Sequence, residues 1–203
     1  MDRQEIDQAT LPSAPVGLFY AWWCADSLPD LSVPSGLTVQ LDPPADVLGQ
    51  LTKLPAEEIA QRFERGNRAV IGRVDGQAAA SGWAAAGRVQ IGELGLDFRL
   101  PPANRYLWDF VTLPAWRGRG LYPALLRAFI EREPAVERFW VGHDLDNVAS
   151  SRGILKTGFK TVGEVYIVDD VGPVFVARGA AAARAPEAAE LLGLPLAPQD
   201  STV

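Results

Sequence analysis

Residues 108–130, WDFVTLPAWRGRGLYPALLRAFI, contain the most informative change of pattern in this sequence. Aromatic and β-branched residues dominate up to Leu113, which is typical of a strand, and Pro114 ends that pattern. Beyond the glycines the apolar residues take helical spacing, and one stripe holds Leu121, Ala124, Leu125, Ala128 and Phe129. Pro123 fits a helix only near its first turn, so we expect the glycines to lie at the helix N-terminus.

The junction between this strand and this helix is suited to bind an anion. Gly118 and Gly120 can adopt positive φ angles and let the backbone approach a ligand closely. The first N–H groups of the helix lack intrahelical partners, and the helix dipole favours negative charge beside them. Arg117 and Arg119 add charge suited to phosphate contacts. A plain turn with solvated arginines fits the same residues, whereas Walker and dinucleotide motifs do not, because their further Lys and Gly residues are missing.

A second segment, residues 147–159, follows the next expected strand (138–142) and reads NVASSRGILKTGF. Together the two segments resemble the GNAT superfamily of N-acetyltransferases. In that family a strand leads into Arg/Gln-x-x-Gly-x-Gly/Ala at a helix start, and Asn-x-x-Ser/Ala, a short helix and Gly-Phe follow further along. The residues that match are Arg117, Gly120, Asn147, Ser150, Gly158 and Phe159. The resemblance covers about residues 37–178.

The resemblance implies a binding site for acetyl-CoA as co-substrate, without a metal. The pyrophosphate would bind the backbone amides of Gly118, Arg119, Gly120, Leu121 and Tyr122. The pantetheine arm would pair, as an added strand does, with Phe110, Val111, Thr112 and Leu113. Asn147 would reach the pantetheine or the sulfur region, and Ser150 belongs to the same cofactor-binding set.

The sequence departs from the family pattern at three positions. Tyr122 stands where Gly or Ala is usual, so its ring must point away from the phosphates. Ile154 stands where many members have a tyrosine that protonates the departing thiolate. Trp108 stands where some relatives keep a glutamate base.

Attack of an amine on a thioester requires a neutral amine, and therefore a group that accepts its proton. Asp109, the one acid on the strand before the glycine loop, is a candidate for this group. Alternatively, Asp109 is a structural carboxylate bonded to the backbone or to Arg105. His143, the sole histidine, ends the next strand and is a second candidate base. Alternatively, it is a structural residue whose hydrogen bonds are satisfied within the fold. Tyr166 is a weaker candidate as the acid.

The whole pattern predicts an α+β fold, a mixed and mostly antiparallel sheet with helices packed on it. Strands are expected at residues 37–41, 69–74, 77–86, 88–100, 105–113 and 138–142, with a closing hairpin at 161–177. A helix is expected from Pro55 to Gly66, and further helices near 121–130 and 150–157. The resemblance implies that the sheet is splayed between the strand ending at Leu113 and the strand ending near Gly142.

The domain organisation follows from the same pattern. Residues 1–36 are expected to be an irregular N-terminal arm, 37–178 the acetyltransferase-like domain, and 179–203 an Ala- and Pro-rich tail with a helical turn or two near 186–192. The aromatic stretch 19–23 either packs the arm, lines an acceptor pocket or forms a homodimer contact. Cys24 is expected to be a buried small hydrophobe.

Composition limits the remaining function classes. A formal charge of −6 argues against a nucleic-acid partner and mildly favours a cationic substrate. One cysteine allows no intramolecular disulfide, residues 1–9 lack the basic region of a signal peptide, and the longest apolar run is too short to span a bilayer. We therefore expect a cytoplasmic protein without membrane contact.

The leading hypothesis is an acyl-CoA-dependent N-acyltransferase that moves an acetyl group to a primary amine of a small or amino-acid-like molecule. The first alternative is a coenzyme A-binding sensor or partner module that has lost catalysis, which the residues at 108 and 154 favour. The second is a structural domain in which the Arg-Gly loop is a solvated turn.

Overall fold

The computed structural model of the chain describes residues 11–197; the start of the predicted arm (1–10) and the end of the predicted tail (198–203) lie outside the described residues. The elements, in chain order, are β1 (Gly17–Trp23), β2 (Leu37–Leu41), α1 (Ala45–Thr52), α2 (Ala56–Glu64), β3 (Arg68–Val74), β4 (Gln77–Ala85), β5 (Arg88–Ile91), β6 (Leu96–Arg99), β7 (Asn104–Thr112), α3 (Leu121–Arg132), β8 (Arg138–Asp144), α4 (Val148–Lys156), β9 (Lys160–Val168), β10 (Gly172–Ala177) and α5 (Ala185–Leu192).

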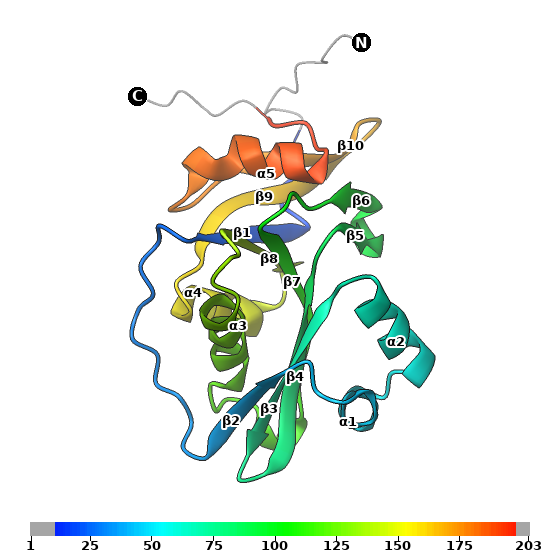
Figure 1. Cartoon of the computed structure of the whole chain (residues 1–203). Helices are drawn as coiled ribbons and strands as arrows, with labels where there is room; N and C mark the ends of the chain where they lie inside the picture. Colours follow the sequence, from blue (N-terminus) through cyan, green and yellow to red (C-terminus); the bar gives the residue numbers. More distant parts are fainter. Residues whose placement is uncertain (1–10, 198–203) are drawn as a thin grey trace.

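One twisted sheet organises the molecule, with the strand order β10-β9-β1-β8-β7-β4-β3-β2 (Figure 1). Every neighbouring pair is antiparallel except β7 and β8. Helices α3 and α4 lie on one side of β3, β4 and β7, and α1 and α2 lie on the other (Figure 1). The predicted α+β class, with its mostly antiparallel sheet and helices on both faces, is confirmed.

The sheet is open between β7 and β8. Their parallel pairing runs only from Asn104 opposite Arg138 to Leu107 opposite Val141, and beyond these residues the two strands separate. On its other edge β7 is bulged against β4, and Asp109 takes a φ of 50° within the bulge. A bulge bends its strand and increases the local twist. The splay predicted between these two strands is therefore confirmed, and the bulge contributes to it.

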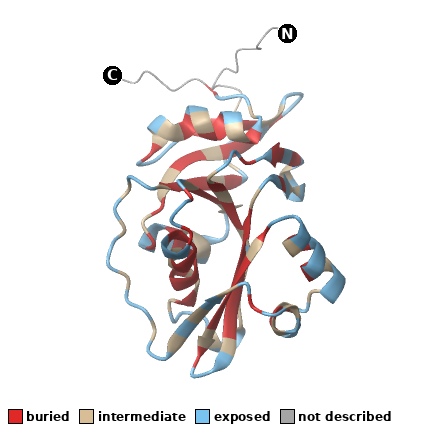
Figure 2. Cartoon of the chain, viewed as in Figure 1, coloured by how far each residue is buried: buried red, intermediate tan, exposed pale blue. Residues whose placement is uncertain are grey.

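The interior forms two large apolar layers, one on each face of the sheet, and the buried residues lie along the strands and the inner sides of the helices (Figure 2). Phe129 and Leu125 of α3 and Phe139 of β8 lie in one layer. Trp140 of β8 and Phe175 of β10 lie in the other, which α5 covers. Strands buried on both faces place alternate residues in different layers, as Phe139 and Trp140 do.

The prediction of an irregular arm at residues 1–36 is wrong for residues 17–23. Residues 17–23 form β1, which pairs antiparallel with both β8 and β9. Phe19 contributes to one apolar layer and Tyr20 to the other, so both faces of β1 are buried. A strand buried on both faces shows no alternation of polar and apolar residues, which is why the pattern did not reveal it. Cys24 is exposed rather than buried, because it follows the end of this strand.

Of two further predictions, the strand at residues 88–100 is corrected and the helix near 186–192 is confirmed. Residues 88–100 are not one strand: β5 and β6 form a separate hairpin, with a tight turn at Gly92–Leu94 and Gly95 at a φ of 63°. The predicted helix near 186–192 is present as α5, and its Ala188 and Leu192 are buried. No helix among residues 11–197 is long and apolar enough to cross a membrane.

Candidate active site

The loop between β7 and α3 has the conformation that the glycines predict. After a single turn at Pro114–Trp116, Gly118 takes a φ of 74° and Gly120 a φ of 78°. Gly120 is the N-cap of α3 and no side chain caps the helix. The N–H groups of Leu121 and Tyr122 therefore have no partner within α3, and Pro123 has no N–H at all. The positive end of the helix dipole is free to receive an anion.

Both loop arginines are held against the loop itself. The Nε of Arg117 donates to the carbonyl oxygen of Thr112 at 3.2 Å, which ties the loop to the end of β7. The guanidinium of Arg119 lies over the ring of Trp116, 4.8 Å from its centroid. The two cations are thus pre-positioned at the N-terminus of α3, where they add to the field of the helix dipole.

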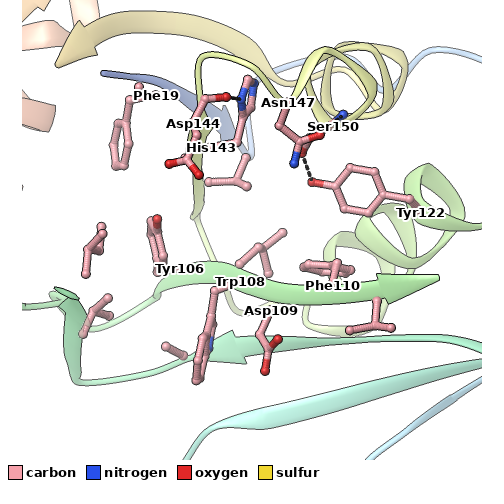
Figure 3. A pocket seen from close by; sticks show the side chains of 18 of the residues that line it. Phe19, Tyr106, Trp108, Asp109, Phe110, Tyr122, His143, Asp144, Asn147 and Ser150 are labelled. Atoms are coloured by element: carbon pink, nitrogen blue, oxygen red, sulfur yellow. Dashed lines mark hydrogen bonds between the residues drawn. The ribbon is translucent and has the colours of Figure 1, made fainter. Parts of the chain in front are cut away.

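Tyr122 directs its ring from α3 toward α4 (Figure 3). Its hydroxyl lies 3.1 Å from the Oγ of Ser150, and its ring meets Phe110 of β7 edge-to-face at 5.1 Å. The ring fits because Gly153 has no side chain: a Cβ there would lie 2.5 Å from the Cδ1 of Tyr122. Burial raises the pKa of Tyr122 to about 12, although its hydrogen bond with Ser150 acts in the opposite direction.

The N-terminus of α4 faces the same space. Asn147 is the N-cap, and its side-chain oxygen accepts a hydrogen bond from the N–H of Ser150 at 3.0 Å. A capping asparagine of this kind fixes the start of a helix. Ile154 is fully buried in the apolar layer beneath α3 and α4, so no polar group comes from that position.

A cavity of about 1540 Å³ joins these elements to the other side of the sheet. The part that we call the cofactor half is lined by the end of β7, the glycine loop, and the N-termini of α3 and α4. The part that we call the acceptor half is lined by α2, the β5–β6 hairpin and the start of β1. Helices α2 and α3 lie on opposite sides of the sheet (Figure 1). Because residues of both line the cavity, we infer that it passes through the opening between β7 and β8.

Asp109 lies in the wall of this cavity, at the bulge of β7. Its carboxylate accepts a hydrogen bond from the Nη1 of Arg62, and its side chain remains 33% exposed. Arg62 also pairs with Glu58 at 2.6 Å and stacks over the rings of Trp108 and Trp83, 4.4 and 5.0 Å from their centroids. Sequence reasoning missed Arg62, because an arginine on the polar face of an amphipathic helix is usually solvated.

His143 also lines the cavity, but both of its ring nitrogens are engaged. The Nδ1 donates to the carbonyl oxygen of Asp144 at 2.7 Å, since a carbonyl can only accept. The Nε2 lies 3.0 Å from the hydroxyl of Tyr20, which in turn lies 2.9 Å from the Oγ of Ser151. Tyr20 comes from β1, the strand that the sequence did not reveal. Proton transfer by His143 would require Tyr20 to release the Nε2.

The remaining candidate does not reach this site. The hydroxyl of Tyr166 donates to Glu164 at 2.9 Å, and the ring packs in a small cluster with Val168 and Val174, away from the residues that line the cavity. The suggestion that Tyr166 is the acid is therefore wrong. Among residues 11–197, no group of three or more His, Cys, Asp or Glu side chains is placed to hold a metal ion.

Comparison with known proteins identifies the fold. No family model matches the chain, and no curated protein matches it in sequence. A GCN5-related N-acetyltransferase from Sphaerobacter thermophilus superposes with a TM-score of 0.51 at 14% identity, over 73% of this chain and 49% of that one. A GNAT-family acetyltransferase from Colwellia psychrerythraea superposes with a TM-score of 0.51 at 14% identity, over 75% of this chain and 55% of that one.

The chain therefore has the GNAT fold, which confirms the resemblance drawn from the two sequence segments. It spans about half the length of the solved chains that it matches.

Proposed function

We propose that this protein is an acyl-CoA-dependent N-acyltransferase, which transfers the acetyl group of acetyl-CoA to a primary amine of a small or amino-acid-like molecule by direct attack. One observation carries the proposal. The cavity runs through the opening between β7 and β8, and its cofactor half ends at the uncapped N-terminus of α3. A long, anionic, strand-like thioester and an amine can thus enter from opposite sides and meet within the sheet.

The cofactor half matches acetyl-CoA in its chemistry. The free amides of residues 118–122, the helix dipole, Arg117 and Arg119 suit a pyrophosphate. Beyond Leu107, β7 has no partner on its β8 side, so the backbone of residues 110–113 can pair with the amides of pantetheine as with an added strand. Asn147 and Ser150 line the opposite wall.

The acceptor half supplies a carboxylate for the proton that the amine must lose. An alkylammonium has a pKa of about 10.4 in water, so a base is needed near neutral pH. Asp109 is our candidate, because it lines the cavity at the bulge and keeps an exposed oxygen face. The leaving thiol has a pKa of about 8.5, so a full proton donor is not obligatory. The hydroxyl of Tyr122 is available as a hydrogen-bond donor on the cofactor half.

A second candidate function is a coenzyme A-binding module without turnover. Two observations favour it: Ile154 places only hydrocarbon at its position, and both nitrogens of His143 are occupied. Under this alternative the cofactor half keeps its role and Asp109 is purely structural.

Two measurements on the purified protein separate these possibilities. Isothermal titration with acetyl-CoA should give saturable binding, and removing both loop cations in Arg117→Ala/Arg119→Ala should weaken it, more at low salt than at high salt. Arg132→Ala, at the opposite end of α3, is the control and should leave affinity unchanged. Thiol release with a panel of amines should then show turnover. Binding without turnover favours the second candidate, and no binding at millimolar acetyl-CoA refutes both.

A further inference from the structure

The acceptor half of the cavity carries an unusual arrangement of arginines. Arg88 and Arg99 lie directly opposite each other in the β5–β6 hairpin, and both line the cavity. Like charges at directly opposed positions of an antiparallel pair destabilise the pairing. Asp97 relieves part of this repulsion, because its carboxylate holds the Arg88 guanidinium through two hydrogen bonds, one of them 2.7 Å long. Arg99 is left without an ion-pair partner among residues 11–197.

A second unpaired guanidinium lies across the cavity. Arg65 follows the last turn of α2, lines the same cavity and has no ion-pair partner within the described part of the chain. The hairpin and α2 lie on the same side of the sheet (Figure 1). Arg65 and Arg99 therefore contribute positive charge to one mouth from two separate elements.

The charged groups of this mouth are nearly balanced in number but unevenly paired. Arg62 pairs with both Glu58 and Asp109, so its one positive charge offsets only one of these two carboxylates, and Arg88 pairs with Asp97. Of the acids that line the cavity on this side, Glu93 and Asp144 have no ion pair among residues 11–197. Arg65 and Arg99 are the two guanidinium groups of the acceptor half that form no ion pair among residues 11–197, although the whole chain carries a formal charge of −6. A carboxylate would therefore find two guanidinium groups that no other side chain in the described part of the chain engages, whereas the net charge of the mouth favours neither sign.

Apolar side chains also line the cavity. The indole of Trp108 and the ring of Phe19 line it, as do Leu94, Val165 and Leu192. These five residues come from β7, β1, the turn between β5 and β6, β9 and α5. Such a surface favours a hydrocarbon or aromatic body over a strongly hydrated sugar-like one.

We propose that the acceptor is an amine whose apolar body also carries a carboxylate, with the carboxylate bound by Arg65 and Arg99 at the mouth. The amine then points toward Asp109 and the opening of the sheet. This inference rests on the proposed function, since it names the class of amine that the same cavity takes. An arginine–carboxylate pair is charge-assisted and can be bidentate, which gives it both strength and direction.

The test uses three amines of equal length that differ only in charge at the far end: aminohexanoate, aminohexanol and diaminohexane. Thiol release is measured at saturating acetyl-CoA, and the ratio of kcat/KM values is the result. We expect aminohexanoate to exceed aminohexanol about tenfold, as one charge-assisted hydrogen bond predicts, and diaminohexane to be the poorest. Phenylalanine and phenylalaninol repeat the comparison with an aromatic body and a carboxylate close to the amine.

Variants locate the effect. Arg65→Ala/Arg99→Ala should abolish the preference for aminohexanoate over aminohexanol. Arg132→Ala removes an exposed arginine outside the cavity lining and should keep the preference. Equal rates with the acid and the alcohol in both pairs, or a preference that survives the double variant, overturn the proposal while transfer itself stands.

Absence of turnover with every amine would count against the proposed function alone. Titration of the same amines into the protein saturated with coenzyme A then decides the present inference. Tighter binding of either amino acid than of its alcohol, lost in Arg65→Ala/Arg99→Ala, supports it. Equal or undetectable binding of acids and alcohols overturns it.

Discussion

Asp26 holds the N-terminal strand in the sheet, and replacing it should cost the fold much of its stability. Its side chain is 4% exposed and lies just beyond β1. It accepts hydrogen bonds from the backbone N–H of Trp23 at 2.8 Å, from Lys160 of β9 at 2.6 Å, and from both terminal nitrogens of Arg184, before α5, at 2.6 and 2.7 Å. One carboxylate thus joins three segments that are far apart in the sequence.

The expected magnitude follows from these contacts. Asp26→Asn keeps the shape of the side chain but leaves Arg184, which is 16% exposed, without its counter-charge. Breaking a buried ion pair costs about 3–5 kcal/mol. Because Lys160 is 42% exposed and can be solvated, we take the lower end, about 3 kcal/mol. For a chain of this size that corresponds to a fall in Tm of roughly 6–12 °C.

The effect should depend on pH in one direction. Burial alone would raise the pKa of Asp26, but the hydrogen bonds from Arg184, Lys160 and the Trp23 backbone outweigh it and hold the pKa well below its usual range. A group whose folded pKa is lowered adds stability above its unfolded pKa of about 3.9, and that stability is lost as the pH falls through the folded value. The difference between the parent protein and Asp26→Asn should therefore be full at neutral pH and shrink below about pH 4.

Thermal unfolding followed by circular dichroism, at neutral pH and in an acid series, measures both effects. Asp30→Asn makes the same change at an exposed site close by and should leave Tm unchanged. A loss of 1 kcal/mol should lower Tm by at least about 2 °C in a chain of this size. If the Tm of Asp26→Asn lies within about 2 °C of the parent value at neutral pH, the carboxylate does not hold β1 in place. That result would refute the reasoning.

Three further substitutions test the site and its packing. Gly153→Ala should lower the free energy of unfolding in urea by about 1–3 kcal/mol, because its Cβ meets the Tyr122 ring; adding Tyr122→Ala should make the glycine substitution nearly harmless. Gly120→Ala places a side chain at a φ of 78°, a strain of about 1–2 kcal/mol, and should weaken acetyl-CoA binding in a titration unless the loop is not the phosphate site. Arg62→Ala removes two aromatic stacks and the partner of Asp109; we expect about 3 kcal/mol lower stability and slower thiol release, and unchanged values in both assays would contradict this role.

Much of this architecture could be predicted from local sequence. The positive φ angles of Gly118 and Gly120 and the start of α3 depend on chain neighbours, and both appear as the pattern indicates. The opening between β7 and β8 followed from the resemblance, and the fold comparison agrees with it.

What could not be predicted depends on distant partners. β1 joins strands that lie more than a hundred residues later, and an aromatic run buried on both faces has no periodicity to reveal it. Arg62 meets Asp109, and Tyr20 meets His143, only after the sheet has formed. Each contact engages a residue that sequence reasoning had selected for chemistry. Proton-transfer roles for Asp109 and His143 remain predictions.

The central claim is that acetyl-CoA binds in the opening between β7 and β8 with its pyrophosphate on the N-terminus of α3. The most direct measurement is a titration of the ¹⁵N-labelled protein with acetyl-CoA, followed by amide chemical shifts. The account predicts saturable shifts centred on Gly118, Gly120, Leu121 and Tyr122, extending along residues 110–113 and to Ser150. Saturable shifts confined to other elements, such as α1 and α2, or no shifts at millimolar ligand, would contradict it.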